Sequence, residues 1–80
     1  MDIRQTLVDV LRELKIDPAG VEADTRLRED LEIDSTEMVE IAVAIEKRLA
    51  VTIDTDRFLG LKTFGEMIRS IEASRTPVQS

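Results

Sequence analysis

Cysteine, histidine, tryptophan and tyrosine are all absent from this chain of 80 residues. Without cysteine the chain forms no disulfide and no thiolate metal site. Without histidine or cysteine it also lacks the commonest general base, the commonest neutral metal ligand and the most reactive side-chain nucleophile. We therefore expect no metal site, no catalytic residues and no enzyme activity of its own.

Basic residues are scarce: 11 lysines and arginines face 17 aspartates and glutamates, which leaves a net charge of −6. Binders of nucleic acid and of anionic membrane surfaces need a basic face, so both classes are excluded. No apolar run is long enough to span a membrane, and residues 1–5 do not resemble a signal peptide. We expect a cytoplasmic protein whose natural partner is a basic protein surface.

Apolar residues recur at helical spacing in two long segments. The first segment predicts a helix over about 2–16, which Pro18 ends. The second predicts a helix over about 35–50 with a core-facing stripe. The two stripes are Ile3, Leu7, Val10, Leu11 and Leu14, and Met38, Ile41, Ala42, Ile45 and Leu49.

Two shorter elements follow the residues Val51, Thr52 and Ile53, which we expect to form a linker. A helical turn is predicted through 57–59, preceded by capping residues and ended by Gly60. A last helix is predicted from Phe64, with Thr63 and Glu66 forming a capping box. Residues 1–73 then make one all-α domain, a four-helix bundle of three main helices and one short helix, and residues 74–80 make a disordered tail.

The connection over 18–34 is unusually long for so small a domain, which is typical of a functional loop. We expect its apolar residues to pin it across the helices. The loop ends at Asp34, a good N-cap, and Glu37 stands where it completes a capping box. Ser35 is then the first helical residue, and a helix N-terminus tolerates an attached phosphate. Considered alone, the Asp34–Ser35 pair predicts only a helix cap.

The second predicted helix also carries apolar residues that its core does not need. Thr36, Val39 and Val43 fall outside the core stripe, on a flank that also carries Glu40 and Lys47. An exposed apolar strip bordered by carboxylates suits docking to another protein. The alternative is that two surface valines have no role.

The order of these elements, with Asp30-Leu31-Glu32-Ile33-Asp34-Ser35-Thr36 at the loop–helix junction, resembles the acyl carrier protein family. The resemblance extends to Val39-Glu40-Ile41, Val51-Thr52-Ile53 and Leu61-Lys62-Thr63-Phe64-Gly65-Glu66, so it covers nearly the whole chain. It implies that Ser35 carries 4′-phosphopantetheine as a covalent cofactor, with Asp34 supporting it, and that acyl cargo rides on the arm as a thioester.

The resemblance also implies partners: a phosphopantetheinyl transferase, and acyl-loading and acyl-processing enzymes with basic docking patches. They would meet a docking strip on the second helix, made of Thr36, Glu37, Val39, Glu40, Val43 and Lys47. We expect the carrier itself to be a monomer.

The chain departs from the family pattern in three features. Glu32 replaces a glycine, so the turn before Ser35 either needs no positive φ or is strained. Thr36 replaces a leucine, and Lys47 with Arg48 makes the second helix less acidic than in fatty-acid carriers. These departures favour a specialised pathway, such as polyketide synthesis, over general fatty-acid synthesis. A peptidyl or aminoacyl carrier, and an unmodified helical adaptor, stay open as alternatives.

Overall fold

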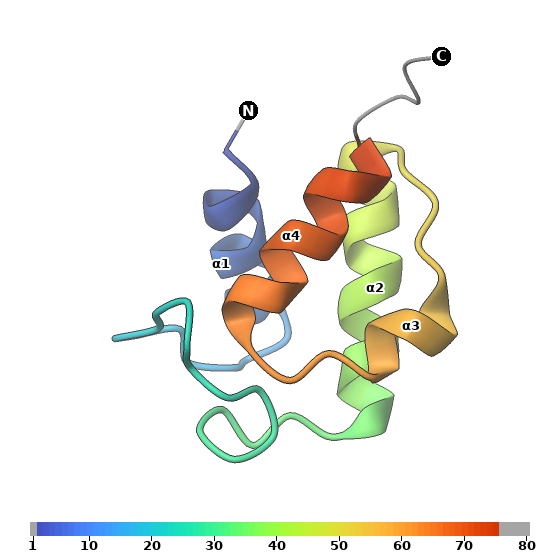
Figure 1. Ribbon diagram of the computed structural model, residues 1–80. Helices are drawn as coiled ribbons and strands as arrows, with labels where there is room; N and C mark the ends of the chain where they lie inside the picture. Colours follow the sequence, from blue (N-terminus) through green and yellow to red (C-terminus); the bar gives the residue numbers. More distant parts are fainter. Residues whose placement is uncertain (1, 76–80) are drawn as a thin grey trace.

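The computed structural model describes residues 2–75, which form a small bundle of α-helices (Figure 1). The part of the chain that it describes contains no strand, only an isolated antiparallel bridge between Arg26 and Thr63. Helix α1 packs against α2 and α4, and α3 packs against α2. The all-α prediction is confirmed, with these bounds: α1 Ile3–Glu13, α2 Ser35–Leu49, α3 Thr55–Leu59 and α4 Phe64–Arg75.

Helix α1 begins where the sequence predicts but ends earlier, at Glu13 rather than near Ile16. Lys15 turns into the left-handed region with φ 65°, and the Ile16 N–H donates to the Leu11 carbonyl at 2.8 Å. This reversal brings Ile16 back onto the core, where it is buried. The burial of Ile16 therefore ends the helix at Glu13, several residues before Pro18 would have ended it.

The other three helices largely follow their local capping signals. Helix α2 ends at Leu49, and Ala50 after it has φ 56°. In α4, the Glu66 N–H donates to Thr63 Oγ1 at 3.1 Å, and the Glu66 carboxylate accepts the Thr63 N–H at 3.4 Å, so the predicted capping box is confirmed. Helix α4 continues to Arg75, two residues beyond the predicted domain boundary at 73. The rest of the predicted tail, 76–80, lies outside the described residues.

The core is aliphatic apart from two fully buried phenylalanines, Phe58 and Phe64. Within residues 2–74 no polar or charged side chain is buried. Over the same residues no helix is long and apolar enough to cross a membrane. The buried core residues are Ile3, Leu7, Val10, Leu11, Ile16, Val21, Leu27, Ile33, Met38, Ile41, Ala42, Ile45, Ile53, Phe58, Phe64, Met67 and Ile71.

The connection between α1 and α2 is pinned by burial, as predicted, and also by backbone pairing with the segment before α4. Its residues Val21, Leu27 and Ile33 are buried. The backbone of residues 23–27 exchanges three hydrogen bonds with residues 62–65. They run from Leu27 N to Lys62 O at 2.9 Å, from Phe64 N to Thr25 O at 3.0 Å and from Gly65 N to Ala23 O at 2.8 Å. The loop is thus tied to the start of α4.

Candidate functional site

Ser35 is the first residue of α2, and its side chain is exposed. The residue before it, Asp34, caps the helix: its Oδ1 accepts the Glu37 N–H at 2.8 Å. The Glu37 Oε1 in turn accepts the Asp34 N–H at 3.1 Å. This reciprocal capping box, which the sequence predicts, fixes the backbone on both sides of the serine and leaves its hydroxyl at a rigid corner.

The residues just before the cap hold that corner against the core. Ile33 is 1% exposed, and its N–H donates to the Leu27 carbonyl at 3.0 Å. Glu32 has φ 56°, a left-handed conformation that favours glycine. Of the two possibilities that the sequence left for Glu32, the strained one is therefore observed. The turn keeps its shape although a side chain occupies the position.

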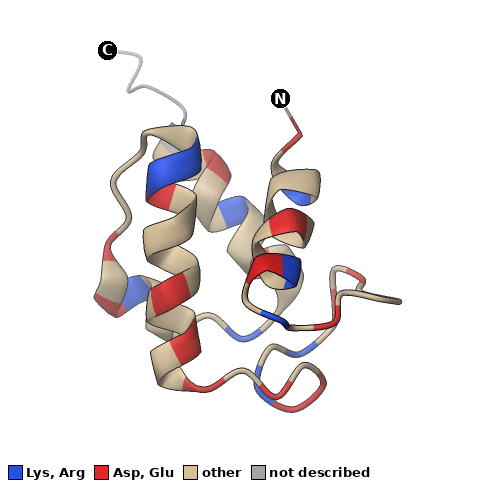
Figure 2. Cartoon of the chain, turned by 180° about the vertical axis from the view of Figure 1, so that it is seen from behind, with Lys and Arg blue, Asp and Glu red and all other residues tan. Residues whose placement is uncertain are grey.

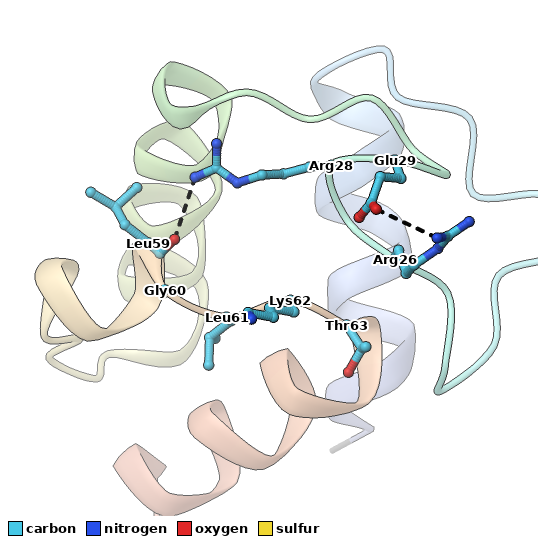
Figure 3. Close-up of a pocket in the computed structure, with 8 residues that line it drawn as sticks. All are labelled: Arg26, Arg28, Glu29, Leu59, Gly60, Leu61, Lys62 and Thr63. Carbon is cyan, nitrogen blue, oxygen red and sulfur yellow. Dashed lines mark hydrogen bonds and ion pairs between the residues drawn. The ribbon is translucent and has the colours of Figure 1, made fainter.

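A residue that the sequence analysis did not assign, Arg28, reaches the serine. Its Nη2 lies 3.4 Å from Ser35 Oγ. The same nitrogen lies 3.4 Å from the carbonyl oxygen of Leu59, at the end of α3 (Figure 3). Within residues 2–75, this guanidinium is the only side chain that makes a hydrogen bond to the serine hydroxyl. Nothing in the sequence spacing indicates this contact, because it depends on how the long loop folds back.

The neighbouring arginine, Arg26, is engaged elsewhere. It pairs with Asp30 at 3.1 Å and with Glu29 at 3.4 Å. The Asp30 carboxylate also accepts the Arg26 backbone N–H at 2.8 Å. The Arg26 guanidinium, together with that backbone bond, lowers the pKa of Asp30, and the carboxylate raises the pKa of Arg26. These contacts close the loop turn from which Arg28 projects.

An open cavity of about 610 Å³ lies beside Arg28, between the loop and the segment that joins α3 to α4 (Figure 3). Basic side chains predominate among its charged residues, in a chain whose net charge is negative. The lining residues are Arg26, Arg28, Glu29, Leu59, Gly60, Leu61, Lys62 and Thr63.

The predicted docking strip lies further along α2. Val39 is 38% exposed and Val43 43% exposed, so both valines are surplus to the core as predicted. Together with Glu40 and Lys47 they line a shallow groove of about 510 Å³, whereas Thr36 and Glu37 lie outside it. Figure 2 shows α2 acidic toward its N-terminal end and basic at its C-terminal end.

Helix α1 contributes to this groove, which the sequence analysis missed. Glu13, the last residue of α1, and Leu14, its C-cap, line it from this side, and Ala44 and Arg48 complete it from α2. Arg48 Nη2 lies 3.0 Å from Glu13 Oε2, so an ion pair closes one end of the groove. Part of the positive charge at the end of α2 is therefore compensated within the chain.

The one side-chain partner of Ser35 among the described residues is Arg28, whose guanidinium can donate hydrogen bonds but accepts none. The same residues contain no cluster of acidic side chains that could hold a metal ion. The fold and the site together define a small helical domain that presents one rigidly placed, exposed serine at a helix start.

Comparison with known proteins identifies the class. The sequence pattern of the family described as "Phosphopantetheine attachment site" matches residues 3–71. An acyl carrier protein of a Sulfurovum species is 31% identical over 71 residues, which cover 89% of this chain and 91% of that protein. A meromycolate extension acyl carrier protein of Mycolicibacterium aurum is 36% identical over 67 residues, covering 82% of this chain and 69% of that protein.

A solved structure agrees with these relatives. The 3,7-dioxo-octyl actinorhodin acyl carrier protein from Streptomyces coelicolor matches with a TM-score of 0.71 and 31% identity, over 92% of this chain and 86% of that one. The chain therefore belongs to the acyl carrier protein family. Its function is that of a carrier with a covalent 4′-phosphopantetheine group, and carriers of this family work with a transferase and with partner enzymes.

The start of α2 fits this group. The Ser35 hydroxyl is exposed, so its oxygen is accessible for a phosphodiester bond. The N–H groups of Ser35 and Thr36 have no acceptor among the described residues, so they are available to a phosphate. The Arg28 guanidinium lies beside the same oxygen. Two backbone N–H donors and one guanidinium thus lie near the Ser35 hydroxyl.

Proposed function

We propose that Ser35 is the residue that carries 4′-phosphopantetheine, with Asp34 holding it in place. The group, when attached, supplies a flexible arm that ends in a thiol, on which acyl cargo is held as a thioester. The chain's own part is to present the hydroxyl at a fixed corner. The observation that supports this assignment best is the capping box of Asp34 and Glu37, which sets the serine at the first position of a 15-residue helix.

The test is intact mass after incubation with coenzyme A and a promiscuous phosphopantetheinyl transferase. The wild-type protein and Ser74→Ala should each gain the mass of one arm, and Ser35→Ala should gain none. Ser74 is the matched control, because it is an exposed serine on α4, remote in sequence from the cap. A wild-type protein that gains no mass, or a Ser35→Ala protein that does, would refute the assignment.

We further propose that the cargo belongs to a specialised pathway, with polyketide intermediates as the first candidate. Glu32, Thr36 and the Lys47–Arg48 pair support this, since they depart from the pattern of general fatty-acid carriers. The similarity to an actinorhodin carrier is consistent with it. Intact mass of the protein purified from its native host tests the proposal, because it weighs the arm together with its cargo. Saturated fatty-acyl groups alone on the arm would contradict it.

The docking strip of Thr36, Glu37, Val39, Glu40, Val43 and Lys47 is proposed as the surface that partner enzymes contact. The exposure of Val39 and Val43 supports this, since apolar groups left outside the core are available to a partner. Glu40 is exposed between them and offers a charge to a basic patch. We propose that the carrier acts as a cytoplasmic monomer, so that the strip is free to meet successive enzymes.

A further inference from the structure

Arg28 is an exposed cation beside the proposed attachment oxygen, and its charge is not neutralised within the described residues. No carboxylate of residues 2–75 lies within ion-pair distance of it. Arg26, two residues earlier on the same loop, is by contrast paired with two carboxylates. What sets Arg28 apart is its position, because its unpaired charge lies beside the Ser35 oxygen and is available there to an anionic ligand.

The hydrogen bonds that Arg28 makes leave most of its donors unused. Both of its bonds, to Ser35 Oγ and to Leu59 O, come from Nη2, and both are 3.4 Å long to uncharged acceptors. Charge-assisted hydrogen bonds to an anion are shorter and stronger than these. The N–H groups on Nε and Nη1 have no acceptor among the described residues. The planar guanidinium therefore retains the donors that a phosphate recognises in pairs.

From this geometry we propose that Arg28 binds the phosphodiester of the arm and orients it, as a positioning residue; the inference rests on the proposed function of Ser35. The phosphorus would be bonded directly to the oxygen that Nη2 already contacts. The nonbridging phosphate oxygens are the next atoms along and carry the negative charge. The charge of Arg28 also offsets the repulsion between that phosphate and the carboxylate of Asp34, which lies one residue away.

The hydrogen bond from Arg28 to Leu59 would connect the bound phosphate to a second element of the fold. The same Nη2 donates to the carbonyl of Leu59, the last residue of α3. A guanidinium held by the phosphate on one side and by this carbonyl on the other links the attached arm to α3. It also stands at the edge of the cavity between the loop and residues 59–63 (Figure 3). The phosphate end of the arm is thus fixed beside this cavity.

The experiment compares apo and loaded protein in wild type, Arg28→Gln, Arg28→Lys and the matched control Arg12→Gln, which removes an exposed arginine from α1. Loading uses coenzyme A and the promiscuous transferase, and intact mass verifies it. The first readout is the ³¹P chemical shift of the phosphodiester as a function of salt. The second is the change in Tm on loading. Because each variant is compared with its own apo form, any loss of stability from the mutation itself cancels.

We expect the wild-type ³¹P shift to depend on salt and the Arg28→Gln shift to be salt-independent, with Arg28→Lys between them. The change in Tm on loading should be more favourable in wild type than in Arg28→Gln by ~2–4 °C, the size expected of one exposed ion pair. Arg12→Gln should behave as wild type in both readouts, because it removes the same charge at a position away from the loop.

Three outcomes would overturn the inference. If Arg28→Gln, once loaded, has the same ³¹P shift and the same salt dependence as wild type, Arg28 does not contact the phosphate. If Arg28→Gln lowers Tm equally in apo and loaded protein, the guanidinium only ties the loop to α3. If the wild type gains no mass at all, the proposed function fails, and the inference fails with it.

Discussion

Replacing Glu32 by glycine should stabilise the fold, because this residue has φ 56° and its side chain makes no hydrogen bond or ion pair among the described residues. The left-handed conformation costs a residue with a Cβ about 1–2 kcal/mol. Glycine avoids that cost but gains freedom in the unfolded chain, which costs about 0.4–1 kcal/mol. The net gain is about 0.5–1 kcal/mol, which corresponds to a rise in Tm of roughly 2–8 °C for a domain of this size.

The assay is urea unfolding followed by circular dichroism, in which the midpoint should rise while the slope m stays constant. Glu32→Ala is the matched control: it removes the same charge from the acidic loop but keeps the Cβ and its strain. Glu40→Gly removes a glutamate from the interior of α2 and should destabilise by about 0.5–1 kcal/mol, opposite in sign. Equal midpoints for Glu32→Gly and Glu32→Ala would refute the reasoning, because the gain would then come from charge and not from φ.

Three more predictions concern packing, acid stability and docking. Gly65→Ala should destabilise by about 1–3 kcal/mol in the same assay, because its Cβ would lie 2.9 Å from the Ala23 carbonyl oxygen; an unchanged midpoint would contradict this. The pKa values of Asp30 and Glu66 are lowered in the folded protein by hydrogen bonds, so their stabilisation is complete above about pH 5 and is lost as pH falls below about 4, toward the lowered pKa of each carboxyl. Urea midpoints measured from pH 7 to pH 3 check this, and a midpoint that rises on acidification would refute it. Glu40→Lys should slow loading by a basic transferase, with the difference fading at high salt and Tm little changed. A loss that persists at high salt together with a lower Tm would assign Glu40 to the fold instead.

The parts of this fold that the sequence predicts are those with local causes. The capping boxes at Asp34 and Thr63 each involve residues three positions apart, so the spacing in the sequence is enough to predict the hydrogen bonds. The surplus of Val39 and Val43 follows in the same way from the helical period, which places them outside the core stripe. The start of α2, and with it the position of Ser35, could therefore be predicted to the residue.

The features that the sequence does not predict depend on contacts between distant segments. Helix α1 ends early because Ile16 is buried, and periodicity alone does not indicate that its pattern stops at Glu13. Arg28 reaches Leu59, 31 residues away, only after the loop has folded back. Glu13 enters the groove on α2 through an ion pair with Arg48 that spans 35 residues. Each of these requires the packing of whole helices, for which a single sequence carries no local pattern.

The pairing between residues 23–27 and 62–65 sets the order in which the site can form during synthesis. A chain growing from its N-terminus makes α1 and α2 first, since their hydrogen bonds are local. The three backbone hydrogen bonds that tie the loop to the rest of the chain need residues 62, 64 and 65. A nascent chain that stops before residue 62 contains the serine, its cap and the turns within the loop, but none of these three bonds. The loop beside the serine is therefore tied in place only once the start of α4 has been made, when synthesis of the domain is nearly finished.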